Sequence, residues 1–150
     1  MEFDVNKSEL LLLHNEHLVN CIALVATKNE GFKIIAKTIG NKVYSLTKPQ
    51  HSAQPNEMLY EFMTKYCPSE KLEQFAFLFP GDNTICVNLN NISEFFIENN
   101  ENGYCTVIGE FKHGDTTRLK LFPEENYDTV KFFLENILYI AENQNIEREQ

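Results

Sequence analysis

The chain lacks the short patterns that mark most catalytic and cofactor sites. It contains no Gly-x-Ser-x-Gly, no Gly-x-Gly-x-x-Gly, no Walker pattern and no His-Glu-x-x-His. Those patterns mark α/β-hydrolases, nucleotide-dependent enzymes and zinc proteases. Acidic pairs such as Glu94 and Glu98 are ordinary surface residues in a chain with 22 acidic residues. We therefore expect a protein that is not an enzyme and has no cofactor.

Cysteine is scarce and dispersed. Cys21, Cys67, Cys86 and Cys105 form no Cys-x-x-Cys pair, a spacing that favours reduced thiols over a disulfide framework or a zinc finger. His14 and His17 precede Cys21 at helical spacing and would share a face on one continuous helix, where they could hold zinc. A β-like run follows His17, so two surface histidines are the favoured interpretation and no metal is expected.

The sequence has no tryptophan and no long hydrophobic run. The apolar run near the N-terminus, residues 10–13, is too short for a signal peptide or a membrane span, and the N-terminus is polar and acidic. We expect a cytoplasmic protein without a transmembrane segment. Twelve phenylalanines and 43% hydrophobic residues in 150 indicate one folded domain over residues 1–142, with a polar, frayed tail over 143–150.

Positive charge is also in short supply. The formal net charge of −9 argues against binding to nucleic acid or an anionic membrane and would suit a basic protein partner. Residues 25–50 are the exception, with five lysines and one glutamate. The candidate anion-binding residues in this stretch are Lys28, Lys33 and Lys37. Solvated lysines on an edge strand are the favoured interpretation, and an anion-binding site is the alternative.

Most of the chain has the alternation and turn residues of antiparallel strands. Residues 18–27 and 32–39 flank an Asn/Gly turn, which predicts a hairpin. Further strands are predicted over residues 42–47, 84–89, 92–98, 104–112 and 116–122.

Three helical segments and a terminal helix are also predicted. Ser8 could cap a short helix over residues 9–15. Steps of three and four between apolar residues predict a helix ending before Pro68, and a second one from Ser69 through Phe79. The last helix should begin at Pro123, with a core stripe formed by Tyr127, Val130, Phe133, Leu134, Ile137, Ile140 and Ala141.

This order of elements resembles the pleckstrin-homology-like superfold, mainly over residues 85–140. The resemblance implies an α+β fold: a bent antiparallel sheet or barrel of about seven strands, here with a short helical insert, and a C-terminal helix. In members that bind lipid headgroups, the first hairpin carries the basic residues. Lys28, Lys33 and Lys37 occupy the corresponding place, although no arginine accompanies them.

Phe132, Leu138 and Tyr139 lie off the core stripe of the last helix and could form a protein interface. The leading hypothesis is a non-catalytic intracellular protein–protein interaction domain. Its expected partner is another protein, for which a basic surface would suit the acidic charge, or a second copy of the chain bound through this helix. One alternative is a small acidic inhibitor or immunity protein that masks a basic, nuclease-like partner. Another is an anion or lipid-headgroup module that uses the lysine hairpin.

Overall fold

The computed structural model describes residues 12, 14–79 and 82–149. The chain divides into two compact units, Met1–Asn88 and Leu89–Gln150, which are described separately below. The predicted α+β class is confirmed: the described residues form eight strands in two antiparallel sheets, with helices that include a C-terminal one. The sheets do not close into a barrel, and the single domain over residues 1–142 stays a prediction. The helix predicted over residues 9–15 falls mostly outside the described residues.

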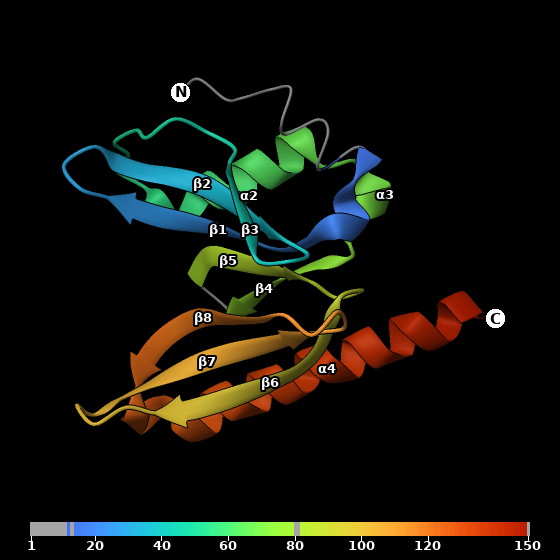
Figure 1. Ribbon diagram of the computed structural model, residues 1–150. Helices are drawn as coiled ribbons and strands as arrows, with labels where there is room; N and C mark the ends of the chain where they lie inside the picture. The colour runs from blue at the N-terminus through green and yellow to red at the C-terminus, as the bar shows by residue number, and fades with distance from the viewer. Residues whose placement is uncertain (1–11, 13, 80–81, 150) are drawn as a thin grey trace. The chain divides into compact units, whose positions relative to one another are not determined.

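The first unit is built on a five-stranded antiparallel sheet with the order β3-β2-β1-β5-β4 (Figure 1). Its strands are β1 (Val19–Thr27), β2 (Gly31–Thr38), β3 (Lys42–Ser45), β4 (Phe75–Phe79) and β5 (Asp82–Asn88). The predicted hairpin is confirmed, because β1 and β2 pair from Val19 with Thr38 to Thr27 with Gly31.

The β1–β2 turn depends on glycine. Gly31 has φ +86°, and a Cβ at this position would collide with the carbonyl of Gln50. The Thr27 hydroxyl donates to the Gly31 carbonyl at 2.9 Å. Phe32 and Gln50 exchange two backbone hydrogen bonds of 2.7 and 2.8 Å. The close approach of these backbones explains why a side chain is excluded from Gly31.

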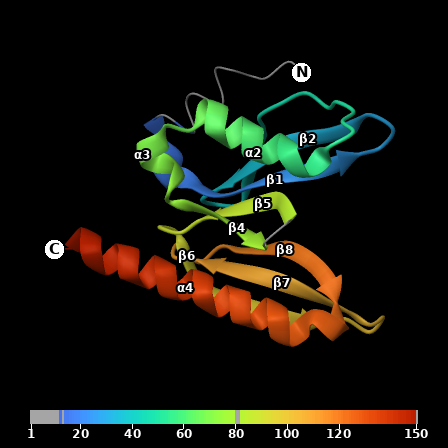
Figure 2. The same cartoon turned by 180° about the vertical axis from the view of Figure 1, so that it is seen from behind.

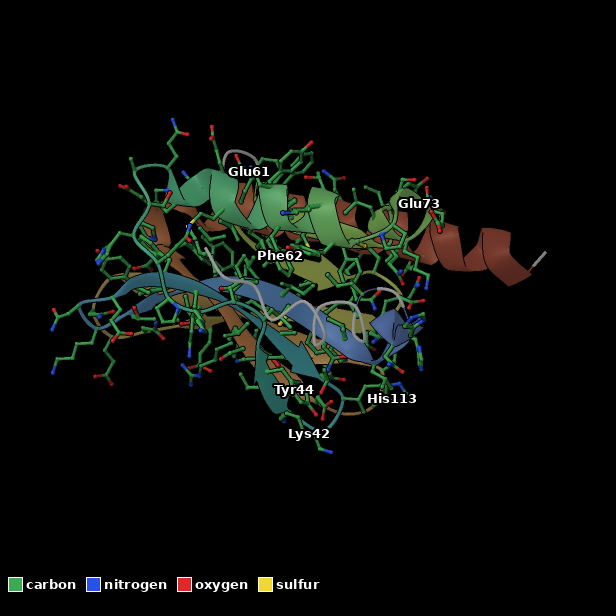
Figure 3. All side chains as sticks on the ribbon, turned by 90° about the horizontal axis from the view of Figure 1, so that it is seen from above. Lys42, Tyr44, Glu61, Phe62, Glu73 and His113 are labelled. Carbon is green, nitrogen blue, oxygen red and sulfur yellow. The ribbon has the colours of Figure 1, made fainter. Side chains whose placement is uncertain are left out.

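Helix α2 (Pro55–Tyr66) covers one face of this sheet. Its side chains Leu59, Phe62 and Met63 pack in one cluster with Ile22 and Ile34 of the hairpin. Figure 3 shows Phe62 between the helix and the strands, whereas Glu61 lies on the outward side. The helix therefore forms because one apolar stripe is buried on the sheet, as its spacing of three and four residues predicts.

One predicted helix is wrong. Helix α3 spans only Ser69–Leu72, and Phe75–Phe79 is strand β4, paired with β5. A short apolar run fits a buried strand as well as a helix face, so periodicity could not separate the two. The backbone pairing of Phe75–Phe79 with β5 makes this segment a strand.

Polar contacts fasten the start of β1 to the rest of the unit. The fully buried Asn88 amide donates to the carbonyls of Glu16 and Val19 at 3.1 and 2.9 Å. Glu16 lies in a short 3-10 helix, η2 (Glu16–Leu18), and accepts a hydrogen bond from Lys71 of α3 at 3.0 Å. Burial of the Glu16 carboxyl alone would raise its pKa, but the bonds from Lys71 and the backbone outweigh it and lower the pKa.

The second unit is a three-stranded antiparallel sheet with the order β6-β7-β8 and one long helix (Figure 2). The elements are β6 (Ile92–Asn99), β7 (Tyr104–Phe111), β8 (Thr116–Pro123), a 3-10 turn η3 (Glu124–Asn126) and α4 (Tyr127–Glu149). The helix does not begin at Pro123 as predicted: that residue ends β8 in an extended conformation with ψ 139°. Proline fits both sites because its φ of −65° is common to them.

Helix α4 lies against the sheet of its own unit, closest to β6 (Figure 2). Its buried residues are Val130, Leu134, Ile137 and Ala141, spaced by four, three and four. The predicted core stripe is confirmed for these four residues. Ile140, also predicted to be in the stripe, is 48% exposed, because it lies about 90° around the helix from the middle of the buried stripe.

Candidate protein-interaction surface

The side of α4 that faces away from its sheet carries exposed aromatic residues. Phe132 and Tyr139 are 61% and 66% exposed. They are seven residues apart, so they lie within about 20° of each other and almost opposite the buried stripe. With Ile140 they form what is here called the outer face of α4. One apolar stripe is enough to pack a helix onto its sheet. The exposed aromatic residues lie outside that stripe and take no part in packing the helix onto its sheet.

A row of acidic residues borders the outer face. Asp128, Glu135 and Glu142 are also spaced by seven and are all exposed. On a helix they project about 20–80° from the aromatic row. Asn136 and Asn143, both exposed and uncharged, lie between the aromatic pair and Ile140. The outer face therefore combines apolar and uncharged polar side chains, and its acidic residues lie on one side only.

Leu138 does not belong to this face. It is half-buried on the other flank of α4, where it lines a groove of about 320 Å³ between the helix and β6. The groove is lined by Glu94, Phe95, Phe96, Ile97, Tyr127, Lys131, Leu134, Glu135 and Leu138. Sequence reasoning missed this site, although the unbroken apolar run Phe95-Phe96-Ile97 in an otherwise alternating strand was a signal for it.

The structure brings two of the three hairpin lysines onto one face. Lys33 and Lys37 are half-buried and point from β2 away from the α2 side, because Ile34 and Ala36 between them face the core. Lys33 Nζ donates to Ser45 Oγ at 3.3 Å. Lys28 lies in the exposed β1–β2 turn. Lys33 and Lys37 thus form a row along β2, and Lys28 lies in the turn that precedes this strand.

The possible zinc ligands lie in different surroundings. His14 and His17 are exposed, whereas Cys21 is buried in β1. Burial raises the pKa of the Cys21 thiol to about 11, despite the nearby Lys37. In the part of the chain that the structure describes, no three histidine, cysteine or acidic residues are grouped to hold a metal.

The other cysteines are buried as well. Burial, followed by the charge of Glu16, raises the pKa of Cys67 to about 11, and burial raises that of Cys86 further. Cys86 and Cys105 lie in strands of different sheets. Buried thiols with raised pKa values are poor nucleophiles, so their role is packing.

The first unit has a hollow of about 290 Å³ between the 50–54 loop and α2. Met58 and Phe62 contribute its apolar lining, and the charged residues are Glu57, Glu61 and Lys65. These three are spaced by four along α2 and expose their side chains. Such a row is the usual solvated face of a helix. The described residues that line the hollow include no histidine or cysteine.

Comparisons of the chain with protein-family models, with curated proteins and with solved structures give no match. Among the described residues, no helix has the length and apolar character needed to cross a membrane.

Proposed function

We propose that the chain is a non-catalytic protein-interaction domain and that the outer face of α4 is its docking surface. The observation that carries this proposal is the exposure of Phe132 and Tyr139, aligned on the side of the helix opposite its buried stripe. Large aromatic side chains are the residues that contribute most to binding at protein interfaces. Exposing two of them costs solubility and does not stabilise the fold.

The bordering charges favour a basic partner, such as an amphipathic helix that carries lysine or arginine beside an apolar stripe. Asp128, Glu135 and Glu142 would pair with such residues and speed association. A second copy of the chain fits less well. In an antiparallel helix pair the acidic border of one copy would face the same border of the other, and the total charge of −9 adds repulsion.

The same charge supports a finer version of the proposal, in which the chain inhibits its partner by covering a basic site. The pleckstrin-homology-like fold remains part of the proposal too. It is supported by the order of three antiparallel strands and a C-terminal helix in the second unit.

Anion binding at the hairpin is a second candidate function. It is favoured by the placement of Lys33 and Lys37 on one face of β2. The two lysines are about 13 Å apart along the strand, at 3.3 Å for each residue. That distance suits separate contacts with an extended anionic surface better than a single phosphate. Salt-sensitive binding to anionic vesicles, lost in Lys33→Glu/Lys37→Glu, would establish it.

Affinity capture with matched variants tests the main proposal. The bait proteins are the wild type, the outer-face variant Phe132→Ser/Tyr139→Ser, and the control Tyr60→Ser, which removes a 53% exposed aromatic from the first unit. We expect one basic protein, in stoichiometric amount, on the wild type and on the control but not on the outer-face variant.

The captured protein should then be purified and titrated against Asp128→Lys/Glu142→Lys, two exposed residues that do not line the β6 groove. Binding should weaken and lose part of its dependence on salt, because charge steering is screened by ions.

In the affinity capture, identical proteins on all three baits would contradict the proposal. A dimer of the purified chain that dissociates in Phe132→Ser/Tyr139→Ser would place a second copy on the face instead.

A further inference from the structure

Strand β6 is an edge of its sheet, since it pairs only with β7 among the described strands. Every second residue of an edge strand directs its backbone N–H and C=O away from the sheet. Proteins usually protect such edges with lysine, proline or a bulge. The other edge, β8, has Arg118 and Lys120, a register shift near Leu119 and Pro123 at its end.

The middle of β6 has no lysine, proline or bulge. Its one register shift lies near its start, between Ile92 and Glu94, and the next residues are Phe95, Phe96 and Ile97. Phe96 is 42% exposed. An exposed apolar edge of this kind is a site where another strand can pair.

The groove between β6 and α4 runs along this edge. Four consecutive residues of β6, from Glu94 to Ile97, line it. Side chains of successive strand residues point to opposite faces of a sheet. A groove lined by four consecutive residues therefore meets side chains on both faces of the strand or the backbone between them.

The opposite wall is supplied by α4 and is mostly apolar. Leu134 and Leu138 lie beside Tyr127, while Lys131 and Glu135 form the rim. At about 320 Å³ the groove is near the lower limit for ligand sites and would hold one or two side chains. A helix would fit poorly, because it is too wide and its backbone groups are already bonded to each other.

We propose that the groove binds an extended peptide segment of a partner protein, which adds to β6 as a further strand and inserts an apolar side chain between β6 and Leu138. Main-chain hydrogen bonds supply the affinity in this mode, and the pocket selects alternate side chains. This site is separate from the outer face of α4, so one can exist without the other.

The test uses a random peptide library displayed on phage and selected against the full chain. Selected peptides, made synthetically, should carry apolar residues at alternate positions. They should bind Leu138→Glu at least about tenfold more weakly than the wild type, because the new carboxylate would be desolvated in the groove. Phe96→Ser should also weaken binding. The control Tyr60→Glu places the same charge at a 53% exposed aromatic of the first unit, and its peptide binding should stay within about twofold of the wild type.

Two further measurements need no substitution in the chain. Methylating the peptide amides one at a time should weaken binding at every second position, because only alternate N–H groups of an added strand point to β6. Amide exchange along residues 94–97 should slow at alternate residues when the peptide binds. The proposal is overturned if no selected peptide distinguishes Leu138→Glu from Tyr60→Glu, or if methylation shows no alternation. Neither result depends on the outer face, so the two sites can fail separately.

Discussion

Two isoleucines of α4 allow the exposure of its outer face to be measured. Ile137 is 8% exposed and belongs to the buried stripe, whereas Ile140, one turn further on, is 48% exposed. The substitutions Ile137→Ala and Ile140→Ala remove the same atoms from the same helix. The difference between their effects therefore reports burial alone.

The magnitudes follow from that burial. Deleting a buried isoleucine side chain typically costs about 2–5 kcal/mol, so Ile137→Ala should lower the free energy of unfolding by about 3 kcal/mol. Ile140→Ala should cost no more than about 1 kcal/mol, because less apolar area is lost and alanine favours the helix. Phe132→Ala, at a 61% exposed ring, should behave like Ile140→Ala.

Urea unfolding followed by far-ultraviolet circular dichroism provides the assay, since the chain has no tryptophan. The slope of free energy against urea should be unchanged among the variants, so that midpoints can be compared. If Ile140→Ala or Phe132→Ala costs as much as Ile137→Ala, the outer face is covered in the folded chain. The reasoning for a free docking surface would then be refuted.

Three further predictions concern the first unit. Asn88→Ala should lower the free energy of unfolding of this unit by about 2–4 kcal/mol in urea, because two carbonyls lose their buried donor. An effect below about 0.5 kcal/mol would mean that the carbonyls find other donors. Glu16 has a pKa below its ordinary value of 4.5, so its bond to Lys71 should stabilise the fold at neutral pH, and this stability should be lost as pH falls below about 4.5. Glu16→Gln should reduce the loss of stability at acid pH, and an unchanged dependence of stability on pH would contradict a stabilising Glu16–Lys71 bond. Gly31→Ala should lower the melting temperature by at least about 4 °C through its collision with the Gln50 backbone; a neutral effect would show that the turn can open.

Local patterns were enough to predict most of the fold. Alternation and the Asn/Gly turn correctly predicted the β1–β2 hairpin, and periodicity correctly predicted that Val130, Leu134, Ile137 and Ala141 face the core. The run Phe75–Phe79 was mistaken for a helix because its apolar residues fit either structure. Only its pairing with β5, which no local pattern contains, makes it a strand.

The candidate binding residues on α4 could also be predicted only in part from local patterns. Periodicity identified Phe132 and Tyr139 as lying off the stripe, and the structure places both on the outer face. Periodicity also grouped Leu138 with these two residues, although Leu138 lies on the side of α4 that lines the groove with β6. Which flank of a helix is covered depends on where the neighbouring strand runs, so the β6 groove could not be found before the sheet and helix were placed together.

The central claim, that a basic partner docks on the outer face of α4, is tested most directly by titration calorimetry with the partner recovered by affinity capture. The account predicts that Phe132→Ser/Tyr139→Ser weakens the dissociation constant at least about 100-fold, or about 2.7 kcal/mol, while the circular dichroism spectrum and unfolding midpoint stay close to those of the wild type. A dissociation constant within about twofold of the wild-type value would contradict it.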